Sequence, residues 1–273
     1  MIFRVAVFCL FVCTSVINWS SAGADDGVPV ILAHRGGAYE YEENTMLGFL
    51  ACYEAGIRVF ETDIRMTKDG VLVILHDDDL KRTHNGTGAI EQMTAAELKQ
   101  ITTKQGQSFL FLDELLEYFA DKPGVMIELE MKTKNHELYP DSRIDEYCVA
   151  LYEAAKRYRP EGSKYVFTSF DKRPLRAIRA LDAKAPTAFI KSAPLSEEFM
   201  AEAKELGANH IACRISGTSR DLVDKAHAQG FKVNCWPGRS PEDFYLAIGL
   251  GVDVHCTDIP TAIQKVKELL PNP

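Results

Sequence analysis

The chain has 273 residues, of which 46% are hydrophobic and 26% are charged, with no long low-complexity tract. This composition is typical of a soluble globular protein, and the length allows one large domain or two ordinary ones. The formal net charge of −8 and the scattered placement of Lys and Arg argue against the basic face that nucleic-acid-binding proteins use, so we expect no nucleic-acid partner.

Residues 1–24 differ in composition from the rest and are predicted to be a secretory signal peptide. Arg4 precedes the apolar run Val5–Ile17, and small residues lead up to Ala24, as at a cleavage site. The apolar run is short for a membrane span, which needs about 20 apolar residues. We therefore expect cleavage near Ala24, a secreted or periplasmic protein without a stable membrane anchor, and one mature domain over residues 25–273.

The cysteines do not form the pattern of a disulfide framework. Cys9 and Cys13 lie in the predicted signal peptide, and an odd number without regular spacing remains. Cys213, Cys235 and Cys256 lie in apolar, strand-like runs, where a cysteine behaves as a small hydrophobic residue. We expect buried thiols, with one incidental bridge as the alternative.

After the signal peptide, apolar runs typical of strands alternate with segments of helical periodicity. The predicted strands are Val30–His34, Arg58–Asp63, Val125–Met131, Tyr165–Ser169, Thr187–Lys191, Asn209–Cys213, Phe231–Trp236 and Asp253–Thr257. The predicted helices are Asn44–Ala55, Asp113–Phe119, Ile144–Tyr158, Lys172–Leu181, Ser196–Leu206, Ser219–Ala228, Pro241–Ile248 and Pro260–Leu270. Asp113, Asp171 and Ser196 are candidate N-caps. A strand followed by a helix, repeated along the chain, predicts an α/β fold of the (β/α)₈ type, with a doubly wound open sheet as the alternative.

One stretch interrupts this alternation, between the second strand and the second helix. Asp69-Gly70 is a strong turn signal, and the apolar run Val71–Leu75 follows it, which predicts a β-hairpin. A short helical stretch is predicted at Thr94–Gln100. We expect a small insertion over about residues 64–112, at the mouth formed by the carboxyl ends of the barrel strands, where active sites of this fold form.

Two of the predicted strands end in pairs of charged residues. Glu61 and Asp63 end the second strand, and Glu130 and Lys132 follow each other two positions apart at the end of the third. Residues two apart on a strand point to the same face. A single acidic pair at a strand end is more often solvated, but three converging carboxylates offer hard oxygen ligands for a divalent cation, Ca²⁺ or Mg²⁺. The sequence therefore predicts a metal site of Glu61, Asp63 and Glu130.

Basic and aromatic residues are predicted at the same mouth. Arg35 offers a planar fork and Lys132 a point charge for a phosphate group, although either cation also suits a role of pairing a neighbouring acid. His34 and His76 are far apart in the sequence and suit a general base and a general acid if the fold places them on opposite sides of a substrate. Trp236 is predicted either to pack the barrel or to line a substrate pocket. Together these groups indicate chemistry on a phosphate ester.

Short polar motifs, each different from the others, are distributed along nearly the whole mature chain. They are His34-Arg-Gly36, Glu43-Asn-Thr45, Glu61-Thr-Asp63, Thr67-Lys-Asp-Gly70, His76-Asp77, Leu80-Lys-Arg-Thr83, Asn85-Gly-Thr-Gly88, Glu130-Met-Lys132, Thr168-Ser-Phe170, Trp236, Gly251-Val-Asp253 and Thr257-Asp258. In this order they closely resemble the motifs of the glycerophosphodiester phosphodiesterase family. No single motif would be specific for this family, but the whole set in this order is specific for it.

The resemblance implies a TIM barrel that hydrolyses small-molecule glycerophosphodiesters to sn-glycerol 3-phosphate and an alcohol, with one divalent cation. It implies a route in which the substrate's own hydroxyl attacks first and water then opens a cyclic phosphate. It also implies supporting roles for Glu43 and Asn44 in the first loop and for Asp77 beside the site. The other roles it implies are His34 and His76 as the acid–base pair, Arg35 and Lys132 as phosphate contacts, and Glu61, Asp63 and Glu130 as metal ligands.

Two other functions remain as alternatives. A phospholipase D-like relative that acts on lysolipids would need an exposed apolar rim for membrane docking, and Phe109–Leu112 is the candidate segment. A catalytically dead phosphoglycerol-binding module is disfavoured because both histidines and all three acids are present. The sequence leaves open the head group, the native metal, the order in which the two histidines act and the oligomeric state.

Overall fold

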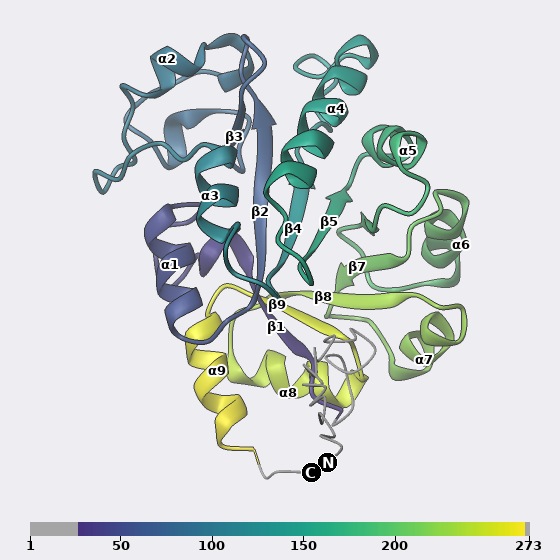
Figure 1. Ribbon diagram of the computed structural model, residues 1–273. Coiled ribbons are helices and arrows are strands. Elements are labelled where there is room, and N and C mark those ends of the chain that lie inside the picture. Colours follow the sequence, from purple (N-terminus) through teal and green to yellow (C-terminus); the bar gives the residue numbers. More distant parts are fainter. Residues whose placement is uncertain (1–26, 271–273) are drawn as a thin grey trace, which may run out of the picture.

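The computed structural model describes residues 27–270, in which eight parallel strands form a barrel (Figure 1). The predicted signal peptide lies outside these residues. The barrel strands are β1 (Val30–Ala33), β2 (Val59–Met66), β4 (Met126–Met131), β5 (Lys164–Ser169), β6 (Thr187–Ile190), β7 (His210–Arg214), β8 (Lys232–Gly238) and β9 (Val254–Thr257). In the sheet the barrel strands pair in the order β1-β9-β8-β7-β6-β5-β4-β2. Strand β1 also pairs with β2, with Leu32 opposite Val59. This last pairing closes the barrel, so the (β/α)₈ prediction is confirmed and the open doubly wound sheet is wrong.

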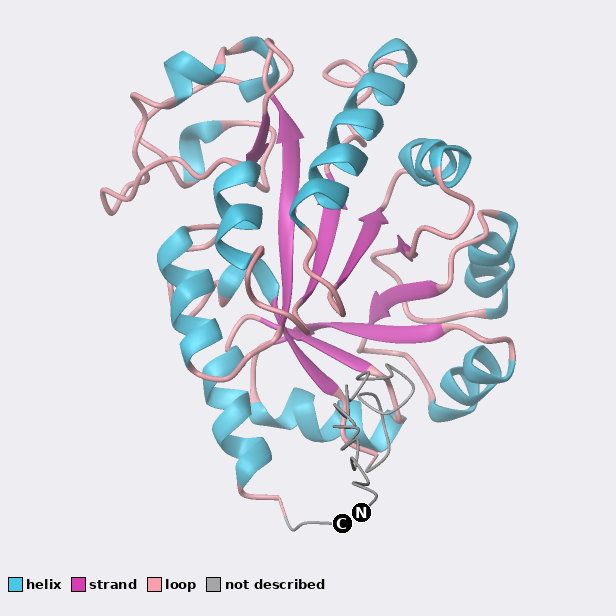
Figure 2. Cartoon of the chain, viewed as in Figure 1, coloured by secondary structure: helices cyan, strands magenta, loops and turns pink. Residues whose placement is uncertain are grey.

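Helices cover the outside of the barrel (Figure 2). They are α1 (Met46–Glu54), α3 (Leu112–Phe119), α4 (Asp141–Tyr158), α5 (Lys172–Leu181), α6 (Glu197–Glu205), α7 (Arg220–Ala228), α8 (Pro241–Leu250) and α9 (Pro260–Glu268). Asp171 and Ser196 accept hydrogen bonds from the first turns of α5 and α6, so both predicted N-caps are confirmed. The predicted cap at Asp113 is wrong, because α3 begins at Leu112 and Phe111 stands at the N-cap. Among the described helices, none combines the length and the apolar character that crossing a membrane requires.

The register between β2 and β4 brings acids from two strands together. Asp63 lies opposite Glu130, and Glu61 lies opposite Glu128. Side chains alternate along each strand, so all four carboxylates point to the same side of the sheet. This side is the barrel interior, since Glu61, Glu128 and Glu130 line one cavity there.

The apolar residues form separate layers inside and outside the barrel. The large core lies between the strands and the surrounding helices and includes Phe49, Phe60 and Phe119. A smaller interior cluster includes Leu32 and Val166. The described cysteines, Cys52, Cys148, Cys213, Cys235 and Cys256, are buried free thiols. Apolar side chains therefore pack against the strands from both the outside and the inside of the barrel.

The predicted insertion is present and has its own small core. Beyond Asp63, strand β2 continues to Met66 and pairs antiparallel with β3 (Leu72–Ile74), forming the expected hairpin. The 3₁₀ helices η2 (Leu80–Arg82) and η3 (Ile90–Gln92) and the short helix α2 (Ala95–Leu98) follow. The insertion's core residues are Val73, Leu75, Leu80, Ile90, Leu98, Phe109 and Phe111.

A buried arginine connects the insertion to the barrel. Arg65 of β2 is 2% exposed, donates from Nη1 to Glu91 Oε1 at 2.8 Å and forms an ion pair with Asp78. Its Nε also donates to the carbonyl oxygen of Leu75 at 3.2 Å. A buried charge is tolerated only where it is paired and hydrogen-bonded. These bonds therefore fix the end of β3, and with it the residues that follow, beside the barrel mouth.

Candidate active site

Most of the predicted site residues line one cavity at the carboxyl ends of the strands. The cavity has a volume of about 230 Å³. A neighbouring cavity is lined by Lys132 and Asp77 and shares His76 and Glu130 with the first. Asp63 is fully buried. The predicted residues that line the first cavity are His34, Arg35, Glu61, His76, Glu130 and Trp236.

Three acids in the mouth form a candidate cation site. One carboxylate oxygen from each of Glu61, Asp63 and Glu130 lies within 4.8 Å of the other two, and all three residues are buried. Within residues 27–270, neither Glu61 Oε1 nor Asp63 Oδ1 has a hydrogen-bond partner. Unpartnered buried carboxylate oxygens are costly, and a hard divalent cation would satisfy them. Asp63 Oδ1 has an ion pair with Lys132 as its charged contact, and Glu61 Oε1 accepts no hydrogen bond from the described residues. The donor set and these two oxygens therefore fit the predicted metal.

The charge balance of the triad gives the same indication. Burial raises the pKa of Glu61 well above its ordinary value, and the nearby charges of Asp63 and Glu130 raise it further. Burial would also raise the pKa of Asp63, but Lys132 and Arg35 outweigh that effect and hold the pKa well below its usual range. Burial and the neighbouring carboxylates thus disfavour the ionised form of Glu61. A bound cation would favour that ionised form.

The two predicted phosphate contacts lie against this acidic cluster. Arg35 Nη1 is 3.1 Å from Glu43 Oε1, and Arg35 Nε is 3.4 Å from Asp63 Oδ2. Lys132 Nζ is 2.7 Å from Glu130 Oε1 and 3.4 Å from Asp63 Oδ1. Both cations thus form ion pairs with neighbouring acids, which is the alternative role predicted for them from the sequence. Arg35 also lines the first cavity, where its guanidinium is available to an anion.

Backbone conformation in the first loop places Arg35 and Asn44. Both have positive φ angles, 51° for Arg35 and 57° for Asn44, a conformation uncommon for residues other than glycine. In this conformation the Arg35 backbone N–H donates to Glu61 Oε2 at 3.0 Å. Asn44 Nδ2 donates to Asp63 Oδ2 at 2.8 Å, and its Oδ1 accepts from the Thr62 hydroxyl at 3.2 Å. The loop predicted to support the site therefore holds two of the three acids in place.

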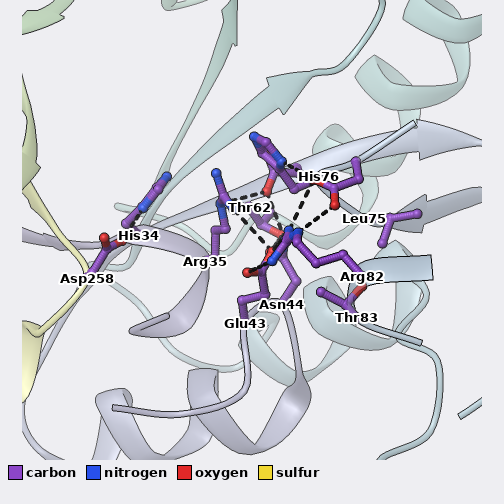
Figure 3. Close-up of polar contacts among 12 residues, drawn as sticks. His34, Arg35, Glu43, Asn44, Thr62, Leu75, His76, Arg82, Thr83 and Asp258 are labelled. Atoms are coloured by element: carbon purple, nitrogen blue, oxygen red, sulfur yellow. Dashed lines mark hydrogen bonds and ion pairs between the residues drawn. The ribbon is translucent and has the colours of Figure 1, made fainter. Parts of the chain in front are cut away.

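Each predicted acid–base histidine has a carboxylate at Nδ1. His34 Nδ1 is 2.5 Å from Asp258 Oδ1, and His76 Nδ1 is 2.7 Å from Asp77 Oδ1. In Figure 3 the two rings lie on either side of Arg35. A carboxylate accepts a hydrogen bond, so Nδ1 of each ring is the donor and Nε2 is left for a ligand. His34 Nε2 is 3.8 Å from Glu61 Oε2, at the edge of the acidic triad.

The environment of His76 favours the neutral ring. Burial lowers its pKa below the ordinary value of 6.5, and the charges of Lys132 and Arg35 lower it further. Asp63 and Asp77 act in the opposite direction but do not offset these effects. At neutral pH the ring is therefore uncharged and can take up a proton.

Trp236 lines the cavity from β8. Its ring lies 6.0 Å from that of Phe170 in an edge-to-face arrangement, and the Arg214 guanidinium lies 5.0 Å from its centroid. The buried indole Nε1 has no hydrogen-bond partner among the described residues. The position supports both roles predicted for Trp236, because the side chain lines the pocket and packs against the apolar cluster in the barrel interior.

Two residues of the site were not among the predicted site residues. Asp258 follows β9 and holds His34, and Arg82 of η2 binds both Asp77 and Glu43. The sequence signals for Asp258 were its position directly after an apolar strand and its place in the family-like motif Thr257-Asp258. Arg82 had no signal beyond its place in a family-like motif, because its partners come from two other segments.

The sequence and the fold have counterparts in known proteins. The model of the Glycerophosphoryl diester phosphodiesterase family matches residues 34–262. A glycerophosphodiester phosphodiesterase of Caldanaerobacter subterraneus subsp. tengcongensis is 29% identical over 256 residues, covering 88% of this chain and 98% of the relative. A glycerophosphodiester phosphodiesterase of Bacillus altitudinis is 27% identical and covers 87% of this chain and 98% of the relative.

Solved structures have the same fold. A phosphodiesterase from Oleispira antarctica, solved in complex with the product sn-glycerol-3-phosphate, superposes with a TM-score of 0.80 at 26% identity, covering 88% of this chain and 97% of that one. A glycerophosphodiester phosphodiesterase from Parabacteroides distasonis superposes with a TM-score of 0.74 at 23% identity, covering 88% and 97% of the two chains. The second likeness bears on the fold alone.

Proposed function

The chain belongs to the glycerophosphoryl diester phosphodiesterase family, and from this membership we propose that it hydrolyses glycerophosphodiesters to sn-glycerol 3-phosphate and an alcohol. The Oleispira antarctica relative, whose structure contains the product sn-glycerol-3-phosphate, supports this substrate class. The observation that carries the proposal is the pair of His–Asp contacts at one cavity with a buried acidic triad. A dead binding module would have no use for two such pairs.

We propose that the two imidazoles move the protons of the reaction. One Nε2 takes the proton of the attacking hydroxyl as its oxygen bonds to phosphorus. The bond from phosphorus to the leaving alcohol oxygen breaks, and the other imidazole gives that oxygen a proton. The attacking hydroxyl belongs either to the substrate's own glycerol, which gives a cyclic phosphate that water then opens, or to water directly. Asp258 and Asp77 orient the rings in both routes.

The proposed metal is a single Ca²⁺ or Mg²⁺ held by Glu61, Asp63 and Glu130. When bound, such an ion neutralises charge on a phosphate oxygen and lowers the pKa of a coordinated hydroxyl. Arg35 binds the phosphate from the cavity wall in this proposal, and Lys132 holds the carboxylates of Glu130 and Asp63 in place through its ion pairs with them.

The lysolipid alternative loses its main structural support. It required Phe109–Leu112 to form an exposed apolar rim, but these four residues are between 0% and 7% exposed and pack in the interior. The predicted docking segment is therefore wrong. Small, water-soluble glycerophosphodiesters need no such rim, and we propose them as the substrates.

The proposed activity is tested with purified protein and a Ca²⁺- or Mg²⁺-containing buffer. Glycerophosphoethanolamine and glycerophosphocholine are each expected to release glycerol 3-phosphate, measured with a coupled glycerol-3-phosphate dehydrogenase assay. Mass spectrometry of early time points distinguishes a cyclic phosphate intermediate from direct hydrolysis. Absence of glycerol 3-phosphate with both substrates, or turnover of lysophospholipids alone, would refute the proposal.

We also propose that residues 1–24 direct secretion and are removed. The expected mature chain begins at Asp25 and is found in the periplasm or the medium when the full chain is expressed in a bacterial host. N-terminal sequencing of the fractionated protein checks this. An intact N-terminus on protein recovered from the cytoplasm would contradict it.

A further inference from the structure

An arginine of the insertion binds two acids of the site at once. Arg82 ends the 3₁₀ helix η2. Its Nη1 and Nη2 donate to the two carboxylate oxygens of Glu43 at 2.6 Å and 2.7 Å. Its Nε and Nη2 donate to the two oxygens of Asp77 at 2.6 Å and 3.1 Å. A planar guanidinium can serve two carboxylates in this way, and charged hydrogen bonds of this length are among the stronger ones in proteins.

Each of these acids holds a group that takes part in the proposed reaction. Glu43 Oε1 accepts from Arg35 Nη1 at 3.1 Å, and Asp77 Oδ1 contacts His76 Nδ1 at 2.7 Å. Figure 3 shows the Arg82 side chain extending to Glu43 beside Asn44. An unbroken series of ion pairs and a final hydrogen bond thus connects Arg35, Glu43, Arg82, Asp77 and His76.

The acids in this series are largely shielded from solvent, unlike those of an ordinary surface ion pair. The side chain of Arg82 is 49% exposed, but those of Glu43 and Asp77 are only 13% and 27% exposed. Burial raises the pKa of Asp77, yet hydrogen bonds from Arg82 and His76 outweigh this and bring the pKa to about 2. Asp77 therefore stays ionised over the whole pH range in which the protein would be assayed. The half-exposed guanidinium is also accessible to solutes.

We propose that Arg82 is a positioning residue that fixes the phosphate-binding Arg35 and the proton-transferring His76 relative to each other. Arg82 itself is not among the residues that line the cavity of His34 and Glu61, so it acts through Glu43 and Asp77. The inference rests on the proposed function for its kinetic readout. It adds a role for the insertion, which would complete the site by bringing this guanidinium to the first loop.

The test compares Arg82→Ala and Arg82→Lys with the unaltered protein. A displacement of about 1 Å in a catalytic group can cost on the order of 100-fold in rate, so Arg82→Ala is expected to lower kcat/KM by roughly 10- to 100-fold. Arg82→Lys is expected to recover only part of this loss, because an ammonium group cannot bind two carboxylates as a fork. Added guanidinium ion is expected to restore part of the activity of Arg82→Ala, whereas sodium chloride at equal ionic strength is not.

Lys81→Ala is the matched control. Lys81 is the exposed neighbouring cation in η2, and it has no ion pair among the described residues. This variant is expected to keep kcat/KM within about twofold of the unaltered protein, since exposed charges away from such contacts contribute little. Combining Arg82→Ala with Asp77→Asn is expected to cost less than the product of the two single losses, because both act on His76.

A second readout does not depend on catalysis. The proton on His76 Nδ1 is identified by NMR as the signal that His76→Ala removes. Its chemical shift is expected to change in Arg82→Ala and to stay unchanged in Lys81→Ala. If Arg82→Ala does not fold, Arg82→Lys serves for both measurements, with an intermediate kcat/KM and a shifted signal expected.

The outcomes separate the two hypotheses. An unaltered protein that releases no glycerol 3-phosphate contradicts the proposed function, and the NMR signal then decides the role of Arg82. An active protein whose folded Arg82 variants keep kcat/KM within twofold contradicts the role of Arg82 alone. An unmoved His76 signal, or a loss that guanidinium fails to reduce in folded Arg82→Ala, also overturns it.

Discussion

Replacing His34 by Ala is expected to lower kcat/KM for glycerophosphoethanolamine by about 10³-fold, and His76→Ala by a similar factor. General acid–base groups contribute on the order of 10²- to 10⁴-fold each. The two rings are the proposed proton carriers, and each is oriented by a carboxylate at 2.5 Å or 2.7 Å. Initial rates with the coupled assay measure the loss, and circular dichroism checks that each variant is folded.

His136→Ala is the control for these histidine variants. His136 is an exposed loop residue whose side chain makes no hydrogen bond or ion pair within residues 27–270, and its replacement is expected to leave kcat/KM within about twofold. Asp258→Asn should give an intermediate loss, since it keeps the His34 ring but weakens its orientation. Full activity in folded His34→Ala or His76→Ala would refute the proposed mechanism.

The pH dependence of kcat/KM assigns the role of His76. Burial lowers its pKa below 6.5, so the ring is neutral at pH 7. If His76 is the base, it must be neutral to act, and kcat/KM falls as the pH drops through the lowered pKa. If His76 is the acid, it must be protonated, and kcat/KM falls as the pH rises through the same value. In either case His76→Ala removes this limb from the residual activity.

Removing the divalent cation is expected to abolish activity, and the loss of one acid should prevent its return. A unit charge about 4 Å from an ion contributes several kcal/mol at an effective dielectric constant of about 20. Asp63→Asn or Glu61→Gln should therefore weaken the Kd for Ca²⁺ or Mg²⁺ by about 100-fold or more. Isothermal titration calorimetry on chelator-treated protein measures this directly. Hydrolysis that a chelator leaves intact would contradict the metal assignment.

Glu128→Gln is the matched control for the acidic triad. Glu128 lies on β4 two residues before Glu130 and is also buried, but its carboxylate accepts from Asn234 Nδ2 at 3.2 Å instead of joining the triad. The variant makes the same carboxyl-to-amide change outside the triad and is expected to bind the cation with a Kd within a few-fold of the unaltered protein. A separate prediction concerns the thermal stability of the metal-free protein. Metal-free Glu61→Gln should have a Tm no lower than the unaltered protein, because the repulsion among the acids is relieved.

Local patterns in the sequence were enough to predict the scaffold. Apolar runs and helical periodicity each depend on residues close in the chain, and they located every barrel strand. Errors fell at element ends: Asp113 lies inside α3, and β2 continues past Asp63 to Met66. Helix and strand ends depend on tertiary contacts, here the pairing of β2 with β3, which the local pattern does not contain.

The sequence also determined which residue types are available for chemistry. The spacing of Glu61 and Asp63 placed both acids on one face of a strand before any partner was known. Two histidines, Arg35 and Lys132 supplied groups suited to phosphate esters, and the ordered motifs indicated the family that the chain belongs to. These conclusions need only the period of a strand and the chemistry of side chains.

Only the tertiary structure decided how these groups meet. The register that sets Asp63 opposite Glu130 turns two strand segments into one acidic triad. Asp258 reaches His34 across 224 positions of sequence, and Arg82 joins two loops that no local pattern connects. The same packing buried Phe109–Leu112, which the apolar pattern alone could not distinguish from an exposed rim. The reason is physical: barrel closure sets the distances between residues far apart in the chain, whereas sequence spacing sets only those within one element.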